Sequence, residues 1–351
     1  MNDMHDCRRN LEKRVIKKEF SRRDFIRAAA VGTAGAAFAS GLAGCGSGSQ
    51  TPRVGLGNMF TENGKPLLAA VEGADLGAML DAGIAAMGGL EKLVKGKTVV
   101  LKPNIVASQP YPVTTDIEMV LAVSERLRGA GAQSITVCDA AGGGVARAEK
   151  FNALNYPSRL EEAGILLDAT DFSDRLSHVF VSKDAWRSHP TIGVVKTIYR
   201  ADVVISLPVV KRHGSARFTC ALKNHFGSVF FPLRQVAHNK QRSAADGTEF
   251  FDTALAEFAD AVRPELNIVD ARTLLVRGGP TLSGAAEVKP GVNRLVLCGD
   301  MLATDIYCSQ LMQEYDETFS PDMISIQLEA ADKLGLGARN LNNVVIKEIV
   351  A

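Results

Sequence analysis

The chain has 351 residues, of which 46% are hydrophobic and 23% are charged, a balance that favours a globular protein with a buried core over extended disorder. Nine of the 40 Lys and Arg residues and five of the 39 Asp and Glu residues lie in the first 44 positions, which leaves the rest with a net charge of −3. A mildly acidic body lacks the basic surface that nucleic acid requires, so no nucleic-acid partner is expected.

The N-terminus has the layout of an export signal. A mostly basic stretch over residues 8–19 leads to Arg22 and Arg23, and residues 28–44 are weakly apolar and rich in Ala and Gly. This order resembles the twin-arginine signal, which implies the twin-arginine translocation machinery as a partner. A retained transmembrane segment is the weaker interpretation, because a spanning helix needs about 20 strongly apolar residues.

The signal ends in a cysteine motif. Leu42-Ala43-Gly44-Cys45 resembles a bacterial lipobox, so we expect residues 1–44 to be removed and Cys45 to carry a lipid. Residues 45–60 are then a flexible linker, and the mature protein is held by its lipid at the periplasmic or outer face of a membrane. The alternative is an Ala- and Gly-rich leader with an incidental cysteine.

Strands and helices alternate beyond the linker. Strands are expected at residues 97–101, 134–138, 201–207, 266–269, 294–297 and 344–349, and helices at 76–95, 115–127, 146–162, 253–262 and 303–313. Thr115 is the expected N-cap of the second helix, with Glu118 completing a capping box. This alternation predicts an α/β fold with a mostly parallel sheet flanked by helices, as one domain over 61–351 with room for a small inserted subdomain within 210–250.

Four cysteines fall within this domain, and none forms a C-x-x-C pair, so neither a zinc ribbon nor a cysteine-held iron–sulfur cluster is predicted. They are either buried small hydrophobic residues or partners in disulfides. The four are Cys138, Cys220, Cys298 and Cys308.

The loops that follow the strands are the expected ligand sites, because ligands of open parallel sheets bind beyond the carboxyl ends of the strands. A glycine run in the second loop could bring backbone N–H groups to an anion, although a plain flexible turn is an equal alternative. The candidates in the first two loops are Lys102, Asn104, Asp139, Gly142, Gly143 and Gly144.

The third such loop is the most basic part of the body. Its charges are interleaved with small and hydrogen-bonding residues, which favours a pocket for a small anionic ligand over a solvated basic face. We expect Lys211, His213 and Lys223 to be catalytic, with His213 moving a proton, and Arg217 and Asn224 to bind ligand.

The remaining histidines and acids are secondary. His213, His225 and His238 have no metal-ligand spacing, so no metal site is predicted. His178, His189 and His238 are expected to be structural, and Asp139 and Asp270 could orient a base or hold a cation. No serine-hydrolase elbow is present.

Several of these segments together resemble the family catalogued as domain of unknown function 362. The resemblance covers about residues 97–315 and is carried by Val99-Val100-Leu101-Lys102-Pro103-Asn104, Thr114-Thr115-Asp116, Leu207-Pro208-Val209-Val210-Lys211-Arg212-His213, Ala221-Leu222-Lys223-Asn224-His225-Phe226-Gly227, Ile268-Val269-Asp270-Ala271 and Ala303-Thr304-Asp305. It implies an α/β fold and, in many members, a ferredoxin-like segment with iron–sulfur clusters, for which this sequence has no cysteine-rich stretch.

A more remote resemblance is to the nickel-pincer lactate racemases, in which a lysine carries a nickel-holding nucleotide and histidines shuttle protons. It implies that Lys211, His213 and Lys223 could hold such a cofactor. The sequence therefore leaves three alternative functions. The first is an envelope enzyme acting on a small anion, and the second is a non-catalytic ligand-capture or docking lipoprotein. The third is a metal- or nucleotide-cofactor-dependent redox or racemase-like enzyme.

Overall fold

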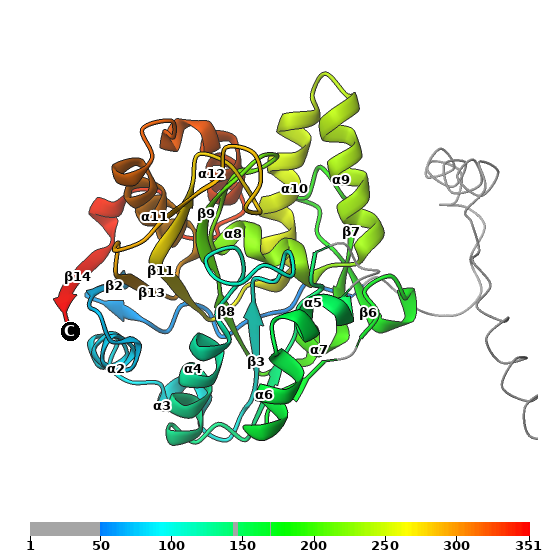
Figure 1. Cartoon of the computed structure of the whole chain (residues 1–351). Coiled ribbons are helices and arrows are strands. Elements are labelled where there is room, and N and C mark those ends of the chain that lie inside the picture. Colours follow the sequence, from blue (N-terminus) through cyan, green and yellow to red (C-terminus); the bar gives the residue numbers. More distant parts are fainter. Residues whose placement is uncertain (1–49, 143–146, 169) are drawn as a thin grey trace, which may run out of the picture. The chain divides into compact units, whose positions relative to one another are not determined.

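A mixed, mostly parallel sheet forms the centre of the protein in the computed structural model, which describes residues 50–142, 147–168 and 170–351 (Figure 1). Its main strands in spatial order are β1 (Thr61–Glu62), β2 (Lys65–Glu72), β13 (Arg294–Cys298), β11 (Leu266–Val276), β8 (Val203–Leu207), β3 (Thr98–Pro103), β4 (Ser134–Val137) and β5 (Leu166–Leu167). The five strands from β11 to β5 are parallel to their neighbours, whereas β13 runs antiparallel to both β11 and β2. This arrangement confirms the α/β prediction.

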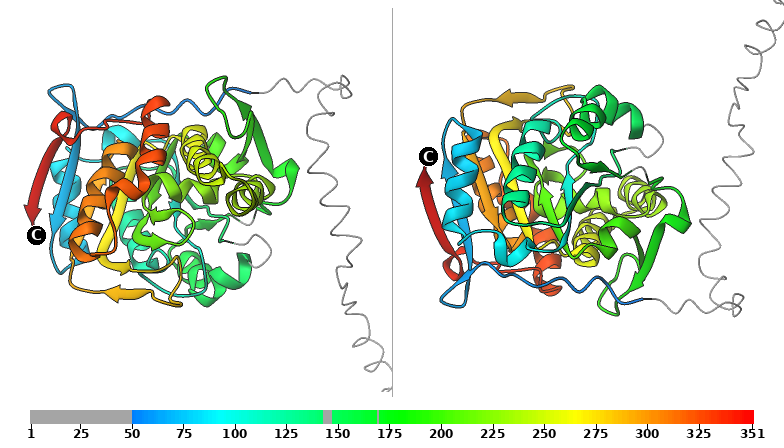
Figure 2. Two further views of the ribbon diagram at one scale, coloured as in Figure 1. Left: turned by 90° about the horizontal axis from the view of Figure 1, so that it is seen from above. Right: turned by 90° about the horizontal axis from the view of Figure 1, so that it is seen from below.

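Further strands extend the sheet or stand beside it. They are β9 (Val209–His213), which lies parallel to β11 and pairs with β10 (Arg217–Thr219), β12 (Glu287–Lys289) on β11, β14 (Val345–Val350) on β2, and a separate hairpin of β6 (His178–Ser182) and β7 (Thr191–Val195). Figure 2 shows β14 at one edge of the body and the β6–β7 hairpin at the other. Because β9 pairs with β11, the segment within 210–250 is continuous with the main sheet.

Helices cover both faces of the sheet (Figures 1 and 2). One face carries α2 (Leu76–Ala86), α3 (Glu91–Val94), α4 (Ile117–Gly129), α5 (Arg147–Ala153) and α6 (Tyr156–Glu162), and the other carries α8 (Ala221–Asn224), α9 (Phe231–Ser243), α10 (Gly247–Val262), α11 (Met301–Tyr315) and α12 (Ser325–Lys333). Short elements complete the chain: α7 (Lys196–Arg200) and the 3-10 helices η2 (Arg175–Ser177), η3 (His225–Ser228), η4 (Pro321–Ile324) and η5 (Leu341–Asn343).

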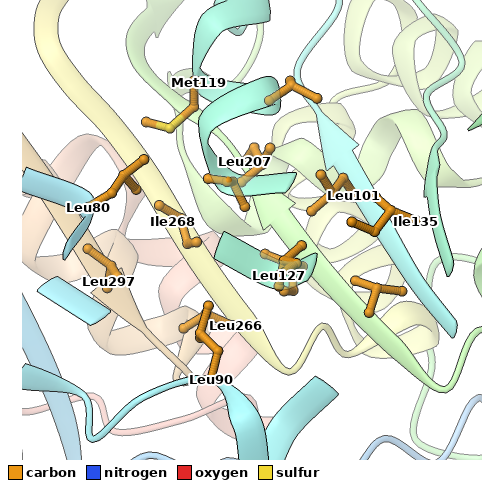
Figure 3. Packing of buried hydrophobic residues seen from close by; sticks show 14 of the residues in the cluster. Leu80, Leu90, Leu101, Met119, Leu127, Ile135, Leu207, Leu266, Ile268 and Leu297 are labelled. Atoms are coloured by element: carbon orange, nitrogen blue, oxygen red, sulfur yellow. The ribbon is translucent and has the colours of Figure 1, made fainter. Parts of the chain in front are cut away.

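The core is built from strands that are buried on both sides. In β8, Ile205 and Leu207 pack toward α2–α6, while Val204 packs with residues of α10 on the opposite face. Figure 3 shows Leu207 beside Leu101 and Ile268 from the two neighbouring strands. A parallel strand covered on both faces needs an unbroken apolar run, which explains why β8 was visible in the sequence.

Two predicted helices are divided in the structure. The 76–95 helix is broken between α2 and α3, where Gly88 and Gly89 have φ angles of 85° and 88°. The 146–162 helix is broken between α5 and α6, where Asn155 has a φ angle of 57°. Left-handed backbone at these positions cannot continue an α-helix.

The N-cap of α4 lies one residue beyond the prediction. The side chain of Asp116 accepts a hydrogen bond from the backbone N–H of Glu118, at 3.1 Å. Thr115 is not available for capping, because its hydroxyl donates to the carbonyl oxygen of Leu207 at 2.7 Å and accepts from the N–H of Asn104 at 2.7 Å. Thr115 therefore links the ends of β3 and β8 instead.

The described part of the predicted linker lies against the body. Arg53 is 6% exposed, forms an ion pair with Glu265 at 2.9 Å and donates to the carbonyl oxygen of Arg263 at 3.0 Å. The residues from about Gln50 onward therefore belong to the body, ahead of the expected boundary at residue 61. The predicted signal over residues 1–44 and Cys45 lie outside the described residues.

Two global features of the body bear on the sequence predictions. Cys138, Cys220, Cys298 and Cys308 are all buried with free thiols, so they act as small hydrophobic residues in this structure. No helix among residues 50–142, 147–168 and 170–351 has the length and apolarity to cross a membrane.

Candidate functional site

The carboxyl ends of β3, β4 and β8 meet around one buried ion pair. Lys102, at the end of β3, pairs with Asp139, which follows β4, and their side chains are 0% and 3% exposed. The Lys102 amine also donates to the carbonyl oxygen of Pro103 at 2.8 Å. Burial lowers the pKa of Lys102, although the charge of Asp139 opposes this shift.

Two asparagines extend this network. The Asn224 side chain accepts from Lys102 at 3.2 Å and from the Asn104 amide at 3.0 Å, and its own amide donates to the Ser206 hydroxyl at 2.9 Å. A buried amide with three side-chain partners holds one orientation. Asn224 therefore fixes the start of η3 against the ends of β3 and β8, a role in positioning more than in direct ligand contact.

Lys211, on β9, is held within the same network. Its amine donates to the side-chain oxygen Oδ1 of Asn104 at 2.7 Å and also to the backbone carbonyl oxygen of Val113, and the residue is 1% exposed. Burial lowers the pKa of Lys211 to about 7. Lys211 does not line the cavity described next. Its amine instead forms hydrogen bonds that hold Asn104 and Val113 in place.

A cavity of about 460 Å³ opens beside this network, at the carboxyl ends of the parallel strands. Basic and aromatic side chains dominate its wall, and no acidic residue is among the described residues that line it. The wall consists of Val106, Gly142, His213, Ser215, Lys223, Phe226, Phe231, Arg234, Gln235, His238, Asn239, Arg242 and Pro280. A cavity with this lining is complementary to an anion.

Lys223 is the lysine that faces the cavity. Its amine lies 3.8 Å from the centre of the Phe226 ring, and it forms no hydrogen bond or ion pair with any residue that the structure describes. Burial, reinforced by the charges of Arg234 and Lys211, lowers the pKa of Lys223 well below its ordinary value. The ring favours the charged amine by about 0.5–2 kcal/mol and so opposes this shift in part.

Arg234, on α9, supplies a cation that the sequence prediction missed. One guanidinium nitrogen donates to the carbonyl oxygen of Gly142 at 2.5 Å, but Nε and Nη1 are buried without a partner in the described chain. Burial lowers the pKa of Arg234 to about 10. Each unpaired buried donor costs about 1–3 kcal/mol, a cost that a bound anion with acceptor oxygens would remove.

The ring of His213 is held in one tautomer. Its Nδ1 accepts hydrogen bonds from the backbone N–H groups of Ser215 and Ala216, both at 3.1 Å. The ring proton must then reside on Nε2, and burial with the charges of Lys223 and Lys211 holds the pKa of His213 well below its ordinary value. This geometry changes the expected role, because a neutral His213 offers an N–H donor to the cavity and has no free nitrogen to take a proton.

His238 differs from the other two histidines that were expected to be structural. The Nδ1 atom of His178 lies 2.9 Å from the carbonyl oxygen of Asp174, and that of His189 lies 3.0 Å from the Ser188 hydroxyl. His238 instead lines the cavity, its Nδ1 is buried without a partner in the described chain, and burial lowers its pKa to about 4. It is therefore a neutral imidazole within the site.

Gly142, the described glycine of the predicted run, lines the cavity. Its carbonyl oxygen accepts a hydrogen bond from Arg234 and so helps to orient that cation. Its φ angle is 67°, and a Cβ at this position would lie 2.3 Å from the carbonyl oxygen of Val106. Gly143 and Gly144 lie outside the described residues.

Two other predicted residues serve structural roles away from the cavity. Arg217 pairs with Asp252 and donates to the carbonyl oxygens of Met323 at 2.9 Å and Ser215 at 3.0 Å, so its guanidinium is used internally. Asp270 accepts from Arg272 at 2.7 Å and from the Tyr111 hydroxyl at 2.8 Å. Neither residue lines the cavity.

Another cavity, of about 660 Å³, lies at the opposite end of the parallel strands, beneath the segment that begins at Gln50. Its basic side chains are already paired: Lys183 and Arg263 both contact the Asp260 carboxylate, at 2.7 and 2.5 Å. Its charges are therefore balanced internally. Across residues 50–142, 147–168 and 170–351, no three His, Cys, Asp or Glu side chains gather in a way that could hold a metal ion.

A helical spacing signal could have revealed the missed residues. Arg234, His238 and Arg242 are four apart on α9 and all line the cavity, so they form one face of the helix. The three residues carry no motif of their own and lie several positions after the most basic loop, so their helical spacing is the signal that marks them.

Comparisons with known proteins identify a family and an export signal. Residues 99–310 match the family model "Domain of unknown function (DUF362)", and residues 19–39 match the twin-arginine translocation signal sequence. The chain thus carries the signal for export across a membrane by the twin-arginine machinery. A thylakoid-associated protein of Synechocystis sp. is 30% identical over 276 residues, which cover 76% of this chain and 77% of that protein.

Two solved structures are similar at low identity. The lactate racemase apoprotein from Thermoanaerobacterium thermosaccharolyticum has a TM-score of 0.49 at 11% identity, covering 69% of this chain and 56% of that one. A protein from Thermotoga maritima has a TM-score of 0.42 at 10% identity, covering 73% of this chain and 59% of that one. This chain spans less than two thirds of either solved chain. The family match covers more than half of the sequence, and the chain therefore belongs to the DUF362 family.

Proposed function

We propose that this protein is a lipid-anchored envelope protein that binds a small anion in the cavity between β9, α8 and α9. The main observation behind this proposal is that Lys223 and Arg234 line the cavity, whereas none of the described residues in its wall is acidic. The unpartnered Nε and Nη1 atoms of Arg234 support a ligand that brings two acceptor oxygens, such as a carboxylate or a phosphate.

The aromatic side chains in the cavity support a ligand with an apolar part as well. Phe226 and Phe231 lie on the cavity wall, and the Arg234 guanidinium carbon lies 5.5 and 5.4 Å from their ring centres. The Arg234 guanidinium thus contacts two rings, which limits its rotamers before a ligand arrives. A pre-ordered cation loses little conformational entropy on binding.

An enzyme and a non-catalytic capture protein remain alternatives for this site, and the neutral His238 favours an enzyme. A neutral imidazole with an unpartnered nitrogen can accept a proton from a bound ligand. The cofactor-holding set of Lys211, His213 and Lys223 fits less well, because the Lys211 amine is occupied by Asn104 and Val113. Lys223 alone of the two lysines offers a free amine to the cavity.

Thermal unfolding in the presence of paired ligands tests the site. Carboxylates and phosphates should raise the melting temperature by preferential binding to the folded state, while their neutral amides or esters should not. The Arg234→Gln variant should lose this response, and the Lys240→Gln variant should keep it, because Lys240 is an exposed cation on the same helix outside the cavity. Equal stabilisation of both variants would contradict the proposal.

Lipidation of Cys45 is tested separately. In a bacterial host given an alkyne-labelled fatty acid, the wild-type chain should take up the label and pellet with membranes. The Cys45→Ala variant should lose both properties, and the Cys7→Ala variant should retain both, since Cys7 precedes the proposed cleavage point. Labelling of Cys45→Ala at the wild-type level would exclude this anchor.

A further inference from the structure

Lys223 differs from the other buried lysines of the site in having an unused amine. The amines of Lys102 and Lys211 each donate to two or more oxygen atoms, and both residues are almost wholly buried. Lys223 is half-buried and lines the cavity, and its amine lies over the face of the Phe226 ring. Its nitrogen is thus the accessible amine of the three.

The surroundings of Lys223 favour a neutral amine. Arg234 on α9, Lys211 on β9 and Lys102 on β3 all disfavour a further positive charge at this point, and burial acts in the same direction. His213 and His238 are neutral imidazoles, so neither carries a charge that could stabilise an ammonium group on Lys223. Asp139 is the acid that opposes these effects, and its carboxylate is already paired with Lys102. A desolvated lysine beside other cations keeps its lone pair at neutral pH.

We propose that Lys223 forms a Schiff base with the carbonyl group of a small oxo acid whose carboxylate is held by Arg234. This inference rests on the proposed anion site and names its substrate class. A 2-oxo acid fits because its carboxylate and carbonyl are adjacent, so one end can meet the guanidinium while the other meets the amine, and its side chain can lie against Phe226 and Phe231.

The covalent step balances without an oxidant or a reductant. The Lys223 lone pair attacks the carbonyl carbon and forms a carbon–nitrogen bond, and the carbonyl oxygen becomes a hydroxyl group. This oxygen then leaves as water, whose two hydrogens derive from the amine, and a carbon–nitrogen double bond remains. The neutral His238 can accept and return the proton during dehydration, and the Nε2–H of His213 can donate to the departing oxygen.

Reductive trapping tests the inference on the exported protein purified from a bacterial host. The protein is incubated with pyruvate and sodium cyanoborohydride, and the adduct is located by intact mass and peptide mapping. We expect one carboxyethyl group for each chain, on Lys223, at least tenfold faster than on the exposed Lys240. Propionate, which has the carboxylate but no ketone, should compete with adduct formation.

The Lys223→Arg variant separates anion binding from Schiff-base formation. It keeps N–H donors at the cavity and leaves Arg234 in place but has no primary amine, so it should still be stabilised by propionate while forming no adduct at this position. Stabilisation by propionate with no adduct on wild-type Lys223, or with labelling no faster than that of Lys240, would overturn the Schiff base and leave the anion site standing. Absence of both propionate binding and adduct would overturn both.

Discussion

Lys102 and Asp139 form an ion pair in which both side chains are almost completely removed from solvent, and it joins the carboxyl ends of β3 and β4 beneath the cavity. Breaking a buried pair by removing one partner leaves an uncompensated charge, which costs about 3–5 kcal/mol. Lys102→Met should therefore lower the free energy of unfolding by this amount in urea denaturation. Lys347→Met, which removes an exposed pair with Glu62, should change it by less than about 1 kcal/mol. Equal effects of the two variants would show that the buried pair is not a structural requirement.

The close approach of η3 to this pair requires glycine at position 227. A Cβ on Gly227 would lie 2.8 Å from Oδ2 of Asp139 and 3.0 Å from the Lys102 amine. Gly227→Ala should reduce the free energy of unfolding by about 1–3 kcal/mol, as overpacking does in cores. Gly129→Ala is the matched control, because its Cβ meets no atom within 4 Å and it lies in α4, where alanine is the better helix former. A stabilising Gly227→Ala substitution would contradict this packing.

Lys211 should make stability depend on pH in a defined direction. Its pKa is about 7 in the folded protein and about 10.4 in an unfolded chain. The unfolded state therefore binds more protons between these values, so the Lys211 contribution to stability increases as pH rises through this window. In urea denaturation, the stability of wild type minus that of Lys211→Met should increase from about pH 7 to about pH 10. A difference that stays constant across this range would show that Lys211 is charged when folded.

His213 should remain neutral through the physiological range. Its Nδ1 is occupied by two backbone N–H groups, so protonation there would lose both hydrogen bonds. Nitrogen-15 NMR should show the Nε2–H tautomer without titration between about pH 8 and about pH 5. His213→Asn should preserve the β9–β10 turn, because the Asn oxygen can replace Nδ1, whereas His213→Leu should lose about 1–3 kcal/mol. Titration near the ordinary histidine pKa would restore His213 as a proton carrier.

The sequence predicts the helices, strands and loops that depend on residues close together in the chain. The apolar run of β8 and the polar loops after β3 and β4 were visible because burial on both faces and strand termination leave patterns within a few residues. The prediction of Thr115 as a cap was wrong because its hydroxyl donates a hydrogen bond to the carbonyl oxygen of Leu207, 92 positions away in the chain. That contact depends on the pairing of β3 with β8, which no local pattern encodes.

The site was predicted in part for the same reason. Lys223 and His213 belong to the basic loop and were identified, but Arg217 lies in the same loop and turns away to Asp252. Arg234 reaches the cavity only because α9 packs beside α10 and returns across the end of the sheet. Side-chain direction within the loop and the placement of α9 are tertiary properties.

The central claim is that Arg234 and Lys223 hold an anion, and calorimetric titration of the exported protein with the most stabilising carboxylate tests it most directly. The account predicts one site for each chain, at least tenfold weaker binding for Arg234→Gln, and unchanged binding for Lys240→Gln, whose charge lies outside the cavity. The dissociation constants of the two variants, compared with wild type, decide the question. Loss of affinity in Lys240→Gln equal to that in Arg234→Gln, or binding that neither variant alters, would place the anion elsewhere and contradict the account.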